Sequence, residues 1–132
     1  MGAVSRSVTS ATGERLTKDF DKFKKAFSYW QKELGLVEYT VYFERTNLGD
    51  RYAEIEVESD GKTATVRYNS LKPKDKHKND TPQAIAFHEV CHLLLADFSA
   101  LARARYATAD DLYSAEESIV RTLENVIYRR IK

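Results

Sequence analysis

The sequence predicts a single α+β domain in which one helix precedes three strands and two further helices follow them. Three observations lead to this expectation. The chain has 132 residues, the length of one ordinary domain. Hydrophobic residues make up 42% of it, so it can bury a real core. Apolar side chains recur at helical spacing in both terminal parts, and they alternate at strand spacing between residues 39 and 69.

The N-terminal part should hold a short tail and one helix. Residues 1–13 are mostly small or polar and lack periodicity, so we expect them to be disordered. A helix is predicted over residues 14–34 and should end at Gly35. Its aromatic residues share one face, which predicts core packing and not a binding site: Phe20, Phe23, Phe27 and Trp30.

The central part predicts a three-stranded, mostly antiparallel sheet. Strands are expected over residues 39–45, 51–58 and 63–69, with turns at 47–50 and 59–62. We expect the third strand, which leads into the next helix, to lie at the edge of the sheet and to line a cleft. An edge strand in that position can pair with an extended peptide.

The clearest chemical information lies in the segment His88-Glu89-Val90-Cys91-His92. Two histidines four residues apart lie on the same side of a helix, so both imidazoles can reach one Zn²⁺ at about 2 Å. Glu89 is too close along the helix to be a comfortable third ligand. It is well placed to bond a water at the metal, which makes it a candidate general base. The motif therefore indicates metal-assisted attack of water on a carbonyl.

This interpretation requires a helix, and the flanking residues predict one. Asp80 or Thr81 can cap it, Pro82 suits its first turn, and apolar residues continue to Ala102 without an interrupting Gly or Pro. A helix that is apolar on most sides should be buried, so its histidines and glutamate need partners. A metal would satisfy them. The alternative is that the two histidines are core residues bonded to backbone or carboxylate groups.

Two further residues, Cys91 and His77, also have expected roles. Cys91 is the only cysteine, so no disulfide can form within the chain. We expect it to be a small buried hydrophobic residue, with a thiolate ligand as the alternative. The third histidine, His77, lies in a basic loop over residues 72–80. We expect this loop to be solvated, and the alternatives are a mobile lid or a site for an acidic partner.

A second C-terminal helix is predicted over residues 108–131. Thr108 and Asp111 form a capping box at its start, and basic residues near its end suit a helix C-terminus. Its apolar residues form one stripe at helical spacing: Leu112, Ile119, Val120, Leu123, Val126, Ile127 and Ile131.

This helix should supply the third metal ligand. A catalytic zinc site has three protein ligands, and no histidine follows His92, so a carboxylate is expected. Glu116 falls inside the apolar stripe, where a metal would offset the cost of burying a carboxylate. It is the first choice, Glu117 at the flank is the second, and Glu124 at the opposite edge is the third. The alternative is that acidic residues near the helix start only interact with its dipole.

A helix with HExxH, a short linker and a helix that supplies glutamate resemble the gluzincin clan of zinc metallopeptidases. The small size resembles the minigluzincins, including those of phages and bacterial mobile elements. The resemblance covers about residues 81–128. It implies a zincin-like metallopeptidase domain over residues 14–132 with one Zn²⁺ per chain. By this resemblance the general base is Glu89, and the ligands are His88, His92 and Glu116, or Glu117 in its place.

One position departs from the clan. Larger gluzincins place an aspartate four residues after the ligand glutamate, to support a histidine. Here Val120 or Arg121 occupies that place, so the support must come from elsewhere.

Two other functions are compatible with the motif. The chain could be a non-catalytic zinc-binding interaction protein, although a purely structural site would not require Glu89. It could also be an SprT-like DNA-associated protease, which also carries an HExxH helix; the further histidine of that family is missing here. The motif also does not exclude hydrolysis of a non-peptide amide.

Charge and composition narrow the expected partners. The formal net charge is +1, which gives no strong nucleic-acid signal. No apolar run approaches the length of a membrane span and no secretory signal is recognised, so no membrane partner is expected. With the single cysteine, this favours a cytoplasmic location. The expected partner is a protein or peptide substrate.

Overall fold

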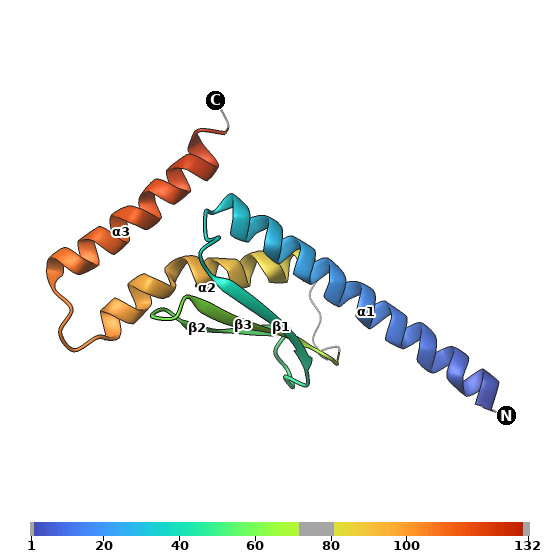
Figure 1. Ribbon diagram of the computed structural model, residues 1–132. Coiled ribbons are helices and arrows are strands. Elements are labelled where there is room, and N and C mark those ends of the chain that lie inside the picture. The colour runs from blue at the N-terminus through green and yellow to red at the C-terminus, as the bar shows by residue number, and fades with distance from the viewer. Residues whose placement is uncertain (1, 72–80, 131–132) are drawn as a thin grey trace.

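The computed structural model describes residues 2–71 and 81–130, with side chains from Thr17 onward. Figure 1 shows α1 and α2 on the same face of a sheet, and α3 leading from the end of α2 back toward the C-terminal end of α1. The predicted α+β class is confirmed. The elements are α1 (Gly2–Glu33), β1 (Thr40–Thr46), β2 (Ala53–Glu58), β3 (Thr63–Asn69), α2 (Pro82–Arg103), α3 (Ala109–Leu123) and a π-helical turn η1 (Glu124–Tyr128).

Helix α1 begins much earlier than predicted. It starts at Gly2 and not at residue 14, so residues 2–13 form helix where we expected a disordered tail. Once a helix is nucleated, each added residue gains one hydrogen bond, and weak formers can then extend it. At its C-terminal end the chain leaves the helix at Gly35, whose φ of 71° suits a residue without Cβ. The predicted stop at this glycine is confirmed.

The sheet is mixed, with strand order β1-β3-β2. Strand β3 pairs parallel with β1 and antiparallel with β2, so the prediction of a mostly antiparallel sheet was only half correct. The expectation that β3 lies at an edge was wrong, because both of its sides are hydrogen-bonded. The edge next to α2 is β2. Sequence alternation places side chains on faces but says nothing about strand order, which depends on the connecting loops.

Asn69, the last residue of β3, holds the loop that carries the chain from β1 to β2 across the end of β3. Asn69 is only 4% exposed, and its side chain makes four hydrogen bonds. The amide nitrogen donates to the carbonyl oxygens of Gly49 (2.9 Å) and Arg51 (2.6 Å). The amide oxygen accepts from the backbone nitrogens of Leu48 (3.2 Å) and Leu71 (3.0 Å). One buried amide thereby satisfies four backbone groups on both sides of the strand end.

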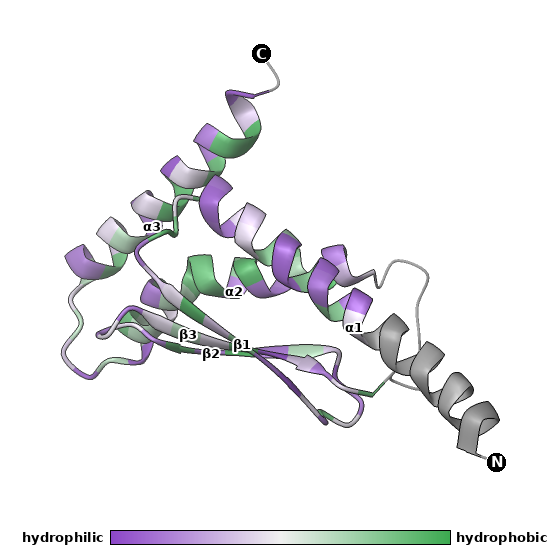
Figure 2. Cartoon of the chain, turned by 45° about the vertical axis from the view of Figure 1, so that its right-hand side comes forward, coloured by the Kyte–Doolittle hydropathy of each residue, from purple (hydrophilic) through white to green (hydrophobic). Residues whose placement is uncertain are grey.

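The core lies between the sheet and the two helices. Phe23 and Phe27 of α1 are fully buried, as the aromatic stripe predicted. The ring of Phe23 lies 4.6 Å from that of Tyr68 on β3, and the ring of Phe27 meets that of Phe43 on β1 edge-on at 5.4 Å. Such aromatic pairs add to the free energy gained by burying apolar area. Figure 2 shows hydrophobic residues of α2 in the layer between α1 and the sheet.

Helix α2 begins as predicted, with the Thr81 hydroxyl accepting from the Ala84 backbone nitrogen at 3.1 Å. Its 22 residues are long and apolar enough to cross a membrane by length and composition, contrary to our expectation that no segment would be. The core helix of a soluble domain passes the same test, and α2 buries Ala86, Val90 and Leu93 inside the fold. This property is therefore weak evidence for a membrane partner.

A polar cluster ties the turn between β2 and β3 to α2. The Lys62 ammonium lies 3.1 Å from Asp97 Oδ2 and 5.0 Å from the centre of the Tyr39 ring. The Tyr39 hydroxyl donates to Asp97 Oδ1 at 3.1 Å. Burial and the neighbouring Asp97 raise the pKa of this tyrosine. Lys62 makes these contacts from a left-handed backbone conformation with φ of 52°, which is uncommon for a residue other than glycine.

Helix α3 begins with the predicted capping box, in which Thr108 and Asp111 exchange side-chain to backbone hydrogen bonds at 3.1 and 3.2 Å. Its last turn widens into η1, which the sequence did not predict. The extra residue in a π turn shifts the following side chains around the axis. Val126 packs against the core, and Arg130 forms an ion pair with Glu33 of α1.

Replacing Asn69 with alanine should lower the free energy of unfolding by about 2 to 4 kcal/mol, because four backbone groups lose their partner. Urea unfolding followed by circular dichroism measures this change. The matched control is Asn47→Ala in the same loop. Asn47 is exposed and accepts one bond from the Gly49 nitrogen at 2.9 Å, so its replacement should cost less than about 1 kcal/mol. Equal effects of the two substitutions would contradict the role given to Asn69.

Tyr68 should make the fold less stable at high pH. Burial, with Asp19 nearby, raises the pKa of Tyr68 to about 12 from 10.0. Between these values the unfolded chain has lost the proton that the folded chain keeps, so rising pH favours unfolding. The loss across this window should reach at most about 2 to 3 kcal/mol. Tyr68→Phe should remove that loss, and Tyr42→Phe, on the exposed face of β1, should retain it. Denaturant titrations at pH 9 and above measure the free energy of unfolding. A parallel decline of this free energy in the wild type, Tyr68→Phe and Tyr42→Phe would disprove the prediction.

Candidate metal centre

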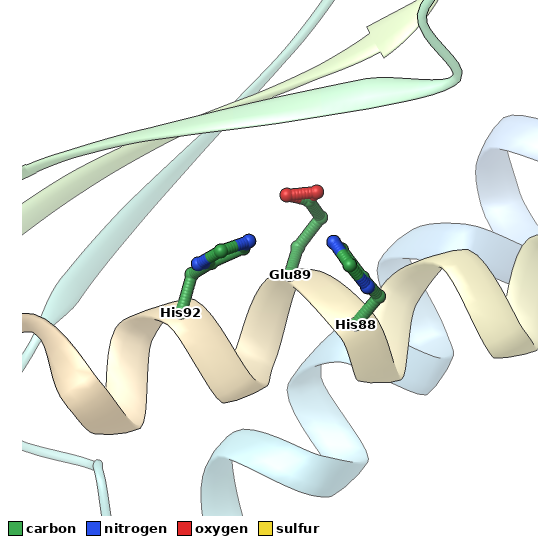
Figure 3. Close-up of side chains that lie close together, drawn as sticks. All are labelled: His88, Glu89 and His92. Atoms are coloured by element: carbon green, nitrogen blue, oxygen red, sulfur yellow. The ribbon is translucent and has the colours of Figure 1, made fainter.

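Three polar side chains of α2 converge on one side of the helix. The potential ligand atoms of His88, Glu89 and His92 all lie within 4.8 Å of one another. The two imidazole rings are 4.9 Å apart between centres and tilted by 77°. Figure 3 shows all three side chains pointing from α2 toward the strands, with Glu89 between the histidines. The helical spacing of the motif therefore produces the predicted convergence.

These side chains face a surface cleft of about 1190 Å³ between α2 and β2. The cleft runs along α2 beyond the histidines, past Leu95 and Ser99 to Arg103. Its opposite wall is β2, which contributes Ala53, Ile55 and Val57. The sequence did not identify this wall, because nothing within residues 53–58 marks them as an edge strand. The residue that determines the position of β2 is distant in the sequence: Asn69 fixes the loop that leads into this strand.

The three groups differ in burial, and the difference is chemically useful. His88 and His92 are exposed, whereas Glu89 is 4% exposed. Burial raises the pKa of Glu89, the two histidines lower it, and Glu54 across the cleft raises it further. A raised carboxyl pKa brings the group closer to the range in which it can both accept and release a proton near neutral pH. Two accessible nitrogen donors thus flank a carboxylate that is shielded from water.

The exposure of the histidines argues against one of the two expectations. As core residues bonded to backbone or carboxylate groups, His88 and His92 would be buried, and they are not. Our premise that α2 is buried on most sides was also wrong. The helix buries one side in the core and turns the motif toward the cleft. Its nitrogen donors are therefore available to an exogenous group.

The structure does not bring the proposed third ligands to this place. Within the described residues, the group of potential ligands contains neither Glu116 nor Glu117, and neither residue lines the cleft. Glu116 is exposed and Glu117 is half-buried, and Glu124 is exposed in η1. The assignment of Glu116, or of Glu117 in its place, as a ligand stays a prediction from sequence.

Glu116 lies away from the cleft because α3 packs on the fold with a different side than the sequence predicted. We expected Glu116 inside a core-facing stripe, which was wrong. Val120, Leu123 and Ile127 of that stripe are exposed. The half-buried side combines Leu112 and Ile119 of that stripe with two small residues that the apolar pattern passed over: Ala115 and Thr122. Small side chains let a helix approach its neighbour closely, so a large apolar residue does not by itself identify the packed side.

The remaining sequence expectations concern Cys91 and the basic loop. Cys91 is half-buried, and burial raises the pKa of its thiol, which disfavours the thiolate. This fits a small packed residue better than a metal ligand. The loop over residues 72–80, with His77, lies outside the described residues.

Comparison with models of protein families, with curated proteins and with solved structures gave no match to this chain. A function must therefore be argued from the chemistry of the site itself.

Wild-type protein offered zinc should bind about one ion per chain, and His88→Ala or His92→Ala should abolish this stoichiometric binding. Elemental analysis after dialysis measures the content. His77→Ala is the matched control and should keep the metal. Loss of metal in Glu116→Ala alone would assign that glutamate as a ligand, and loss in Glu117→Ala alone would assign the other. A wild-type protein that takes up no zinc would refute the metal centre.

Proposed function

We propose that this chain is a zinc-dependent metallopeptidase that hydrolyses peptide bonds with Glu89 as the general base. One observation carries the proposal: two exposed imidazoles flank a buried glutamate in a cleft bounded by an edge strand. A structural zinc site would need its ligands closed around the ion and would have no use for a cleft. Open access to the donors favours catalysis over structural support.

The donor set fits Zn²⁺. Two imidazole nitrogens, each about 2.0 to 2.1 Å from a tetrahedral ion, would be about 3.3 Å apart. That separation is within the 4.8 Å over which the donor atoms of His88 and His92 already converge. We propose these two residues as ligands, with Glu116 as the third and Glu117 as its alternative. When bound, zinc would polarise the scissile carbonyl and make a water molecule more acidic.

Glu89 would move the proton. Its carboxylate projects between the two histidines and can accept a proton from the water that attacks the carbonyl carbon. The same carboxyl can then release this proton to the leaving amine, so that the base returns to its starting state. Its burial supports this role, because bulk water competes less for the proton inside the cleft.

Strand β2 would orient the substrate. Its outer edge has no strand partner among residues 2–71 and 81–130, and it borders the cleft. An extended peptide could hydrogen-bond to this edge and lie across the metal centre. The arrangement of helix, edge strand and motif helix is consistent with a zincin-like fold, which we include in the proposal.

Glu89→Gln should keep zinc and lose hydrolysis by a factor of about 10² to 10⁴, because the amide cannot accept the proton. The assay is mass spectrometry of a diverse peptide mixture incubated with the zinc-loaded protein. Full activity in Glu89→Gln would exclude the role of this residue as base. Stoichiometric zinc without cleavage of any peptide by the wild type would favour the non-catalytic zinc-binding protein instead.

A further inference from the structure

Helix α3 carries apolar side chains on two sides, although it packs on only one. Ala115 and Ile119 line a cavity beside α2, and Val126 joins the core. The outer side carries a second apolar set, here called the outer row, with exposed fractions of 62%, 47%, 41% and 58%: Tyr113, Val120, Leu123 and Ile127. A helix that packed only through its inner side would place polar residues there.

One carboxylate interrupts the outer row. Glu116 precedes Val120 by four residues and Leu123 by seven, so all three lie on the same side of α3. Glu116 is exposed, like its apolar neighbours. A lone carboxylate is costly in a contact between apolar surfaces unless a cation pairs with it there. The outer row therefore fits a surface that combines apolar side chains with a metal site.

Helix α2 presents such a surface beside its histidines. Phe87, Cys91 and Leu95 follow one another at four-residue spacing and form a row along the helix, here called the α2 row. Phe87 and Leu95 are 41% and 44% exposed, and Cys91 is half-buried. His88 directly follows Phe87 in the chain, and His92 directly follows Cys91. The candidate metal centre therefore borders the α2 row.

The α2 row lies within reach of α3. Leu94 lines the cavity of about 820 Å³ between α2 and α3, so the present contact between these helices is loosely packed. Leu94 and Leu95 are neighbours in the chain and lie about 100° apart around the helix axis. Residues 104–108 connect the two helices, and five residues can span up to about 17 Å. This connection is long enough for α3 to move around α2 and slide along it.

We propose that α3 moves from its present position onto the α2 row, so that Glu116 reaches the ion held by His88 and His92. The inference rests on the proposed metal centre. In this second arrangement the outer row would pack on the α2 row, with α3 antiparallel to α2. The carboxylate that interrupts one row would meet the metal that borders the other. A site with two protein ligands would thereby gain its third.

The balance of contacts allows zinc to control this move. The move exchanges one apolar side of α3 for the other, so apolar area is exposed and buried together. The ion pair of Arg130 with Glu33 would break, which costs little because both side chains are partly exposed. A ligand shifts such an equilibrium by its difference in affinity for the two states. Zinc has one more protein ligand in the second arrangement, so it should favour that arrangement.

A distance measurement by pulsed electron spin resonance on the whole chain tests the move. Spin labels at Lys32→Cys and Arg129→Cys lie at exposed positions beside the contact between α1 and the end of α3. Cys91→Ala removes the native thiol from this protein. The chelator-treated protein should show one short separation, and one equivalent of zinc should lengthen it by more than about 5 Å, one helical turn. Adding Glu89→Gln should not change this response, because the move requires the metal and not hydrolysis.

Zinc content, measured in the same samples, separates the outcomes. One zinc per chain with an unchanged separation would overturn the inference and leave the metal centre standing, with its third ligand from another source. The outer row would then be a surface for another molecule. A protein that takes up no zinc would overturn the inference and the metal centre together.

Val120→Glu tests the contact between the two rows. Val120 is exposed in the present arrangement, so the substitution should leave that arrangement intact while placing a second carboxylate in the proposed contact. It should keep the separation short when zinc is added and weaken zinc binding by about tenfold or more. Val37→Glu is the matched control, because Val37 is also exposed (67%) but belongs to neither row, and it should respond to zinc as the wild type does.

Equal responses of these two variants to zinc would contradict the contact between the rows. Circular dichroism checks that each variant is folded. If Val120→Glu fails to fold, the distance measurement without this substitution decides the proposal alone.

Discussion

The buried amide of Asn69 is the constraint on which the arrangement of the site depends. Its four hydrogen bonds fix the loop that crosses the end of β3, and that crossing separates β1 from β2. With β3 in the centre, β2 becomes the free edge beside α2. The wall of the cleft that faces His88 and His92 is therefore set by a residue that does not touch the site.

Helix α2 serves the core and the cleft at once. Ala86, Val90 and Leu93 pack inward, and the positions between them carry the motif outward. Helical spacing links the two sides rigidly, because a rotation that moved Glu89 away from the cleft would also remove Val90 from the core. Packing energy therefore helps to orient the polar groups, as rigid secondary structure commonly does for functional sites.

Local features of this fold followed from the sequence, whereas long-range arrangement did not. The N-cap at Thr81, the capping box at Thr108, the stop at Gly35 and the full extent of β3 are set by neighbouring residues, and they were predicted. So was the convergence of His88, Glu89 and His92, since one helix supplies all three. Strand order and the packed side of α3 depend on residues distant in the chain. In the sequence, Asn69 looks like an ordinary strand end. Glu116 was expected to face the core, because the sequence does not show that small residues such as Ala115 form the packed side.

The contact of Lys62 with Asp97 and Tyr39 has a consequence for how the two walls of the cleft can move. It links the β2–β3 turn to the C-terminal half of α2, so the two walls of the cleft are held together at that end. Lys62 and Asp97 are both partly exposed, so dissolved salt weakens their attraction. Ionic strength should therefore change the stiffness of this joint and, with it, how widely the opposite end of the cleft opens.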